Sequence, residues 1–223
     1  MTTLLEFFDE HERRFKDAGA ADLYRLKYFF EAREGVDVPR LEWEMNLFFR
    51  LMESLKPKRL RVSVEKTVEK PTLGPPTIIV RDSIGRDFSF WYKPYFLVPL
   101  SDGPKTIMLD LACMRGEHAS MYSLGEKALG QFDSRNPVRE TAVRLTTHLK
   151  PLQLTILTKP RFSAKDAGDV QAVSYFLKPR NMFLASQYPM PDMLKSSLPL
   201  NTRYAESVDI NFQKFTDAVK PLL

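Results

Sequence analysis

The sequence contains few of the residues that build disulfides and metal clusters. Cysteine occurs once, at Cys113, and the three histidines (His11, His118 and His148) lie far apart in the chain. A single cysteine cannot form a disulfide within the chain or a multi-cysteine zinc site, and scattered histidines argue against a His-rich metal site. The lack of cysteine pairs favours a cytoplasmic protein.

Long apolar runs are also lacking. The longest, Phe88–Leu100, is interrupted by one lysine and two prolines, so we predict no membrane-spanning helix and no membrane partner. The first residues include Glu6, Asp9 and Glu10 and resemble neither a signal peptide nor a transit peptide.

The composition indicates a packed globular protein. Of the 223 residues, 43% are apolar and 12% aromatic, which is enough to form a substantial core. The 33 basic and 28 acidic residues leave a net charge of +5, which permits a nucleic-acid partner without requiring one.

The first third of the chain has helical periodicity. A capping box at Thr3–Glu6 opens one helix, a second is predicted over residues 20–33, and a third over 39–55. We therefore expect residues 1–38 to form a helical N-terminal extension, followed by a core over residues 39–223. In the third helix Glu44 lies inside the apolar stripe, where a carboxylate is unusual and is a candidate for a functional site.

Strand patterns follow this helix. Residues 60–64 and 77–80 predict two strands, and residues 86–93 predict a third with Phe88, Phe90 and Tyr92 on one face. Turns at 82–85 and 101–104 then join these strands to a further strand over residues 106–113. The sequence thus predicts an antiparallel meander.

Helices and strands alternate in the last third of the chain. We predict helices opening at Asn136-Pro137 and at the Ser163–Asp166 capping box, strands over 152–157 and 181–186, and a terminal helix over 212–222. The predicted fold class is α/β, with a mixed sheet that contains an antiparallel meander and is flanked by helices.

Asp110 is the most unusual residue of the predicted meander. Aliphatic residues stand on both sides of it in the strand 106–113, and a buried charge costs several kcal/mol unless it is paired or binds a metal. Three interpretations are open: a metal ligand, the start of a cofactor-binding loop, or a carboxylate that is only hydrogen-bonded within the core.

The order of elements resembles the restriction-endonuclease-like core of the PD-(D/E)XK nuclease superfamily. In that family a helix supplies a glutamate, one strand an aspartate, and the next strand an acidic residue, any residue and a lysine. Glu44, Asp87 and Asp110-Leu-Ala112 stand at matching places in this sequence. The resemblance covers residues 39–186, with Ala112 where the family has its lysine.

This resemblance implies a metal-dependent phosphodiesterase or a catalytically degenerate relative. It assigns catalytic roles to Asp87 and Asp110, and a Mg²⁺ or Mn²⁺ site to Glu44, Asp87 and Asp110, since grouped carboxylates suit hard divalent cations. A hairpin between the two strands would bring Asp87 and Asp110 close together. It also implies a nucleic-acid substrate, with DNA favoured over RNA, and leaves a homodimer open.

Two alternatives remain. The segment Leu109–Gly116, followed 17 residues later by Asp133, resembles the first motif of class I S-adenosylmethionine-dependent methyltransferases, which implies a glycine-rich cofactor loop after a strand. The other alternative is a non-enzymatic nucleic-acid-binding or assembly subunit.

Several basic residues are candidates for contact with phosphates. The main cluster is Lys56, Lys58, Arg59 and Arg61, and Arg115 lies just after the Asp110 strand. Later elements end in further candidates: Lys159, Arg161, Lys165, Lys178 and Arg180. A solvated rim is the competing interpretation for all of them.

Overall fold

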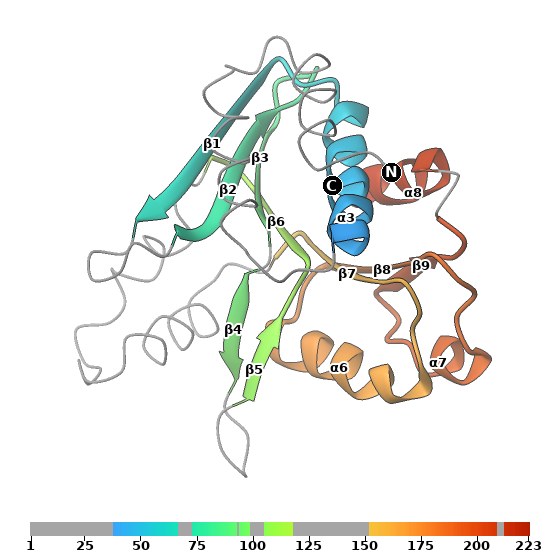
Figure 1. Ribbon diagram of the computed structural model, residues 1–223. Coiled ribbons are helices and arrows are strands. Elements are labelled where there is room, and N and C mark those ends of the chain that lie inside the picture. The colour runs from blue at the N-terminus through green and yellow to red at the C-terminus, as the bar shows by residue number, and fades with distance from the viewer. Residues whose placement is uncertain (1–37, 67–72, 93, 99–104, 118–151, 209–211) are drawn as a thin grey trace, which may run out of the picture.

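The computed structural model describes residues 38–66, 73–92, 94–98, 105–117, 152–208 and 212–223 (Figure 1). The helices and helical turns are α3 (Val38–Ser54), η1 (Ala164–Asp166), α6 (Ala167–Ala172), η2 (Val173–Leu177), α7 (Asp192–Ser196), α8 (Phe212–Val219) and η3 (Lys220–Leu222). The strands are β1 (Arg59–Lys66), β2 (Leu73–Arg81), β3 (Asp87–Tyr92), β4 (Tyr95–Val98), β5 (Lys105–Met108), β6 (Leu111–Arg115), β7 (Leu154–Lys159), β8 (Asn181–Ser186) and β9 (Thr202–Ala205).

Seven of these strands form one mixed sheet in the order β1-β2-β3-β6-β7-β8-β9. The strands from β1 to β7 pair antiparallel, whereas β8 is parallel to β7 and β9 is parallel to β8. The segment η1-α6-η2 connects β7 to β8. The predicted α/β class, with an antiparallel meander in a mixed sheet flanked by helices, is therefore confirmed.

Helices α3 and α8 cover one face of the sheet (Figure 1). The predicted helix over 39–55 is confirmed as α3, whose apolar side chains are buried against those of β1, β2, β3 and β8. Phe215 of α8 packs edge-on against Phe183 of β8, with ring centroids 5.5 Å apart. Such aromatic pairs bury a large apolar area, which explains why α8 is held on this face.

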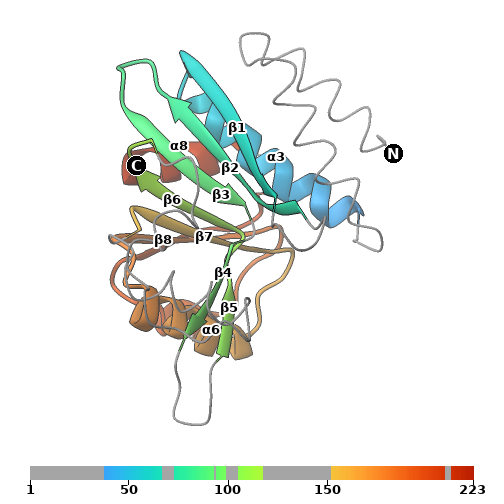
Figure 2. The same ribbon diagram turned by 90° about the vertical axis from the view of Figure 1, so that its left-hand side faces the viewer.

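The segment η1-α6-η2 and α7 cover the other face. Val170, Val173 and Leu194 pack there with Trp91 of β3 and with Met182 and Leu184 of β8. The predicted alternation in β3 is confirmed, because Phe88, Phe90 and Tyr92 belong to the α3 side and Trp91 to the α6 side. The short β4–β5 hairpin lies beside α6 (Figure 2).

The continuous strand predicted over residues 106–113 is wrong. The chain forms β5 up to Met108, leaves strand geometry at Leu109 and Asp110, and starts β6 at Leu111. The two strands belong to different sheets, so an apolar run that reads as one strand is two short ones joined at a polar residue. Asp110 consequently lies at the end of a strand and not in its middle.

Other predicted elements lie outside the described residues: the helices of the N-terminal extension and the helix opening at Asn136-Pro137. Between β8 and α8 the chain forms α7 and β9, for which we predicted no element. Among the helices of the described part of the chain, none combines the length and the apolar character that crossing a membrane requires.

Candidate functional site

Asp110 is held at the start of β6 by the end of β7. Its carboxylate Oδ2 accepts a hydrogen bond from the backbone N–H of Thr158 at 2.6 Å, and its own N–H donates to the carbonyl of Ile156 at 3.2 Å. The residue is only 9% exposed. These bonds place the Asp110 carboxylate next to Lys159, the last residue of β7.

Lys159 is one of two cations, with Arg40, that line this region. Its Nζ pairs with Oδ1 of Asp166 in η1 and lies 5.9 Å from the centroid of the Phe162 ring. Burial raises the pKa of Asp166, but hydrogen bonds from Lys159 and from the N–H and hydroxyl of Ser163 outweigh that effect and hold the pKa below its ordinary value. Asp166 therefore remains ionised at neutral pH.

A cavity of about 240 Å³ opens between these groups. Its polar lining consists of Arg40, Asp110, Thr158, Lys159, Asp166 and Asp169, and its apolar lining of Ile107, Leu157, Phe162, Val170 and Val173. Sites for drug-sized ligands usually measure about 300–1,000 Å³. This cavity therefore has room for a phosphate group or a small ion rather than for a complete nucleoside cofactor.

One buried polar group beside the cavity is unsatisfied. Thr158 is 5% exposed, and its side-chain hydroxyl has no hydrogen-bond partner among the described residues. Buried hydroxyls in native proteins are normally bonded to protein or to a bound molecule. The Thr158 hydroxyl could therefore bond a small polar ligand after a slight adjustment of its rotamer.

Glu44 is buried, as its position in the helical stripe suggested, but it is engaged by other groups. Oε1 accepts a hydrogen bond from Nε of Arg40 at 3.0 Å and Oε2 accepts one from the Tyr92 hydroxyl at 3.2 Å. Arg40 also lines the cavity. Glu44 is thus connected to the cavity through Arg40.

Asp87 lies at the other end of the sheet. Phe88 pairs with Arg115 and Tyr92 with Leu111, so Asp87 is close to Gly116, and about six residues of strand, or about 20 Å, separate it from Asp110. The predicted approach of Asp87 to Asp110 is wrong. The chain forms β4 and β5 between β3 and β6, and the β3–β6 register places the two aspartates at opposite ends of this strand pair. Among the described residues, no group of three His, Cys, Asp or Glu side chains could hold a metal ion.

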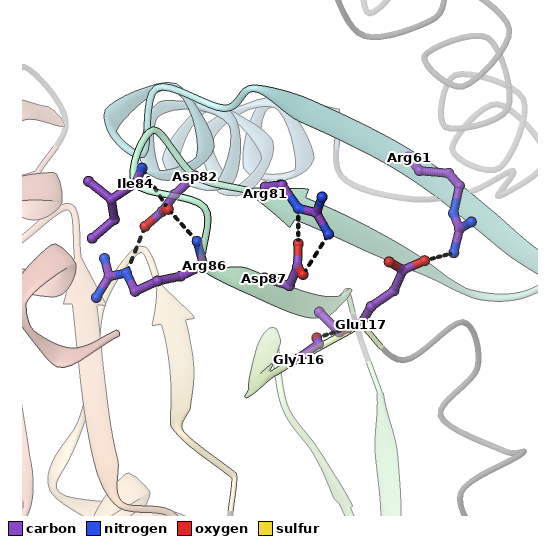
Figure 3. Close-up of polar contacts among 9 residues, drawn as sticks. Arg61, Arg81, Asp82, Ile84, Arg86, Asp87, Gly116 and Glu117 are labelled. Atoms are coloured by element: carbon purple, nitrogen blue, oxygen red, sulfur yellow. Dashed lines mark hydrogen bonds and ion pairs between the residues drawn. The ribbon is translucent and has the colours of Figure 1, made fainter.

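Asp87 has a local partner instead. Arg81 binds it through two hydrogen bonds, Nε to Oδ1 at 2.8 Å and Nη2 to Oδ2 at 2.9 Å (Figure 3). The hydrogen bonds from Arg81 hold the pKa of Asp87 below its ordinary value, and the charge of Arg59 acts in the same direction. This arrangement is a surface ion pair between β2 and β3.

The glycine-rich cofactor loop expected after Leu109 is also wrong. Residues 111–115 form β6, which pairs antiparallel with β3 and β7, and Ala112 and Met114 are buried within it. Gly116 ends the strand with a φ of 99°, a conformation that glycine adopts readily. Asp133, the other residue of this interpretation, lies outside the described residues.

Cys113 is fully buried on the opposite face of β6 from Ala112. Burial raises the pKa of its thiol well above the ordinary value, so it does not provide a thiolate nucleophile. It packs as a small buried hydrophobic residue.

The basic residues of the main cluster lie near Asp87 and not near the cavity. Lys56, Lys58 and Arg59 are exposed, and Arg61 pairs with Glu117 at 2.5 Å (Figure 3). Arg115 is separate from them, because it lies on the α3 side of β6 and donates two hydrogen bonds to the Leu223 carbonyl.

Sequence reasoning assigned Lys159 only to phosphate contact and missed its proximity to Asp110, and it missed Arg40 and Arg81 entirely. A lysine directly after a β-branched strand was the available signal for Lys159. Its position at the same cavity as a residue 49 positions earlier has no local signature. Comparisons with protein-family models, with curated proteins and with solved structures found no match to this chain.

Proposed function

We propose that this chain is a PD-(D/E)XK-like nucleic-acid-binding protein that lacks one carboxylate of the cleavage site. The observation that carries the proposal is the position of Asp110 and Lys159 on adjacent strand ends, β6 and β7, at one cavity. The surrounding order supports it: α3, the antiparallel strands β1, β2, β3, β6 and β7, a helical segment and the parallel strand β8.

The family pattern fits this structure better when it starts at Asp110 and continues in β7 than when it starts at Asp87, as the sequence indicated. If Asp110 is the first aspartate, the next strand in the sheet is β7, and its last three residues are Leu157, Thr158 and Lys159. Lysine then occupies its family position, and Leu157 replaces the acidic residue. Ala112, expected at the lysine position, would have no role in the site.

The residues present do not complete a centre for Mg²⁺ or Mn²⁺. Such a centre usually uses one or two carboxylates together with substrate phosphates. Asp110 and Asp169 line the cavity, but Leu157 supplies no carboxylate, Asp166 is paired with Lys159, and Glu44 is hydrogen-bonded to Arg40 and Tyr92. Among the described residues, no three of these side chains come together in a group that could hold a metal ion. We therefore propose binding of a phosphodiester, with Arg40 and Lys159 supplying positive charge, and we derive no cleavage step.

Restoring the missing acid tests this proposal. Wild-type protein should bind duplex DNA or RNA in fluorescence anisotropy without a divalent cation and should leave it intact. Leu157 lies two residues from Lys159 on the same strand face and lines the cavity, so Leu157→Glu should add the second carboxylate. We expect this variant to bind Mn²⁺ in calorimetry and to gain Mg²⁺-dependent cleavage.

Leu157→Gln, which has a similar size without the charge, is the matched control and should gain neither property. Failure of the wild type to bind any nucleic acid would refute the proposed function. Wild-type cleavage that Leu157→Glu leaves unchanged would show that another acid completes the centre.

A further inference from the structure

A second group of cations lies about 20 Å along β3 from the cavity, at the Asp87 end of the sheet. Arg59 pairs across strands with Arg81, and Arg61 stands two residues from Arg59 on the same face of β1. Leu60 and Val62, which alternate with Arg59 and Arg61 along β1, are buried toward α3. The three arginines therefore share the face that α3 does not cover.

The position of Arg59 opposite Arg81 is electrostatically unfavourable. Like charges directly opposite one another in an antiparallel pair destabilise it. Asp87 compensates Arg81 through two hydrogen bonds, but Arg59 is exposed and makes no ion pair with any described residue. The pair therefore has an excess positive charge, which a bound anion would balance.

Neighbouring residues extend this surface. Lys56 and Lys58 are exposed just before β1. Arg86 in the β2–β3 turn pairs with Asp82 at 2.7 Å and lies over the Phe88 ring on the α3 side, so it is not part of this surface (Figure 3). We name the set Lys56, Lys58, Arg59, Arg61 and Arg81 the arginine face. Its five cations meet two carboxylates, those of Asp87 and Glu117, which leaves three positive charges.

We propose that the arginine face binds the phosphate backbone of a nucleic acid, at a place distinct from the Asp110 cavity. This inference rests on the proposed function for the choice of nucleic acid as the anion. Guanidinium groups form bidentate hydrogen bonds with phosphates, and three of the five cations are arginines. Such contacts position a nucleic acid without reading its sequence.

An anionic membrane is the main competing partner. Ile84 in the β2–β3 turn is 73% exposed and could enter a lipid surface. Stable attachment to a membrane generally requires a larger apolar face together with basic residues. A single exposed side chain does not provide that face, so the row of arginines favours a nucleic acid.

The test is the salt dependence of binding to a DNA duplex of about 20 base pairs, because each phosphate contact contributes about 0.9 to the slope of log K against log salt. The double variant Arg59→Ala plus Arg61→Ala leaves the Arg81–Asp87 pair intact. Its slope should be smaller by about 1.8, so that between about 50 and 200 mM salt the wild-type affinity falls about 12-fold more than that of the variant.

Arg203→Ala plus Lys214→Ala is the matched control. Both side chains are exposed. Arg203 lies on β9, six strands from β1 or about 29 Å across the sheet, and Lys214 lies on α8, which covers the opposite face of the sheet. This control removes the same charge and should keep the wild-type slope. Circular dichroism should show that both double variants remain folded.

Four outcomes would overturn this inference. A wild-type slope in the Arg59/Arg61 variant, with DNA binding retained, refutes the arginine face while the proposed function survives. An equal loss in the control assigns the effect to net charge. Binding to vesicles containing phosphatidylserine that DNA does not compete for assigns the surface to a membrane. Absence of any nucleic-acid binding refutes both proposals.

Discussion

Replacing Asp110 by alanine should destabilise the protein as well as alter the cavity. The Asp110 carboxylate accepts a 2.6 Å hydrogen bond from the Thr158 N–H, and both residues are buried. Hydrogen bonds to charged groups contribute about 1.5–3 kcal/mol, and loss of this acceptor leaves a buried N–H without its partner. We therefore expect Asp110→Ala to lower the free energy of unfolding by about 2–3 kcal/mol.

In a protein of this size, 1 kcal/mol corresponds to about 2–4 °C in Tm, so the variant should melt about 4–12 °C lower. Differential scanning calorimetry and urea unfolding would measure the change. Asp110→Asn keeps an oxygen acceptor of the same shape and should lose clearly less stability. Equal stability of Asp110→Ala and wild type would refute the reasoning, because it would mean that the carboxylate does not secure the end of β7.

The remaining predictions concern the ion pair between Asp82 and Arg86 in the β2–β3 turn and the aromatic contact between α8 and β8. Burial raises the pKa of Asp82, but hydrogen bonds from the Arg86 side chain and from the Ile84 and Arg86 N–H groups outweigh burial and lower the pKa. The ionised Asp82 therefore stabilises the fold above about pH 4, and this stabilisation is lost as the pH falls through the lowered pKa of the folded state. Asp82→Asn should therefore flatten the acid side of a stability-versus-pH curve measured by urea midpoints, and an unchanged curve would contradict this. Phe215→Ala removes a fully buried ring that packs on Phe183 and should cost about 3–5 kcal/mol in urea unfolding, whereas substitution of the exposed Gln213 on the same helix should cost little.

Local patterns were sufficient to predict much of the fold. The alternation in β3 and the apolar stripe of α3 each indicate an element whose buried face is decided by its own residues. The helical segment after β7 was predicted from the Ser163–Asp166 capping box, which is present. These signals work because period and capping are local properties of the chain.

The site was harder to predict because it depends on pairing between distant segments. Asp110 looked like the middle of a strand, since nothing in Ile107–Leu111 shows that β5 and β6 belong to different sheets. Its proximity to Lys159 follows from the β6–β7 register, and the separation of Asp87 follows from the β3–β6 register. Strand register of this kind is determined by the whole fold rather than by short motifs.

The packing of α3 against α8 has a consequence for how the protein is made. From Ser54 to Phe212 the chain runs 158 residues, so α3 leaves the ribosome long before its partner is synthesised. At about 5–20 residues per second, that interval lasts about 8–30 s. During it, the apolar side of α3, including Phe49 and Leu51, lacks the cover that α8 provides in the finished core. Nascent chains of this protein should therefore be clients of ribosome-associated chaperones until the last helix emerges.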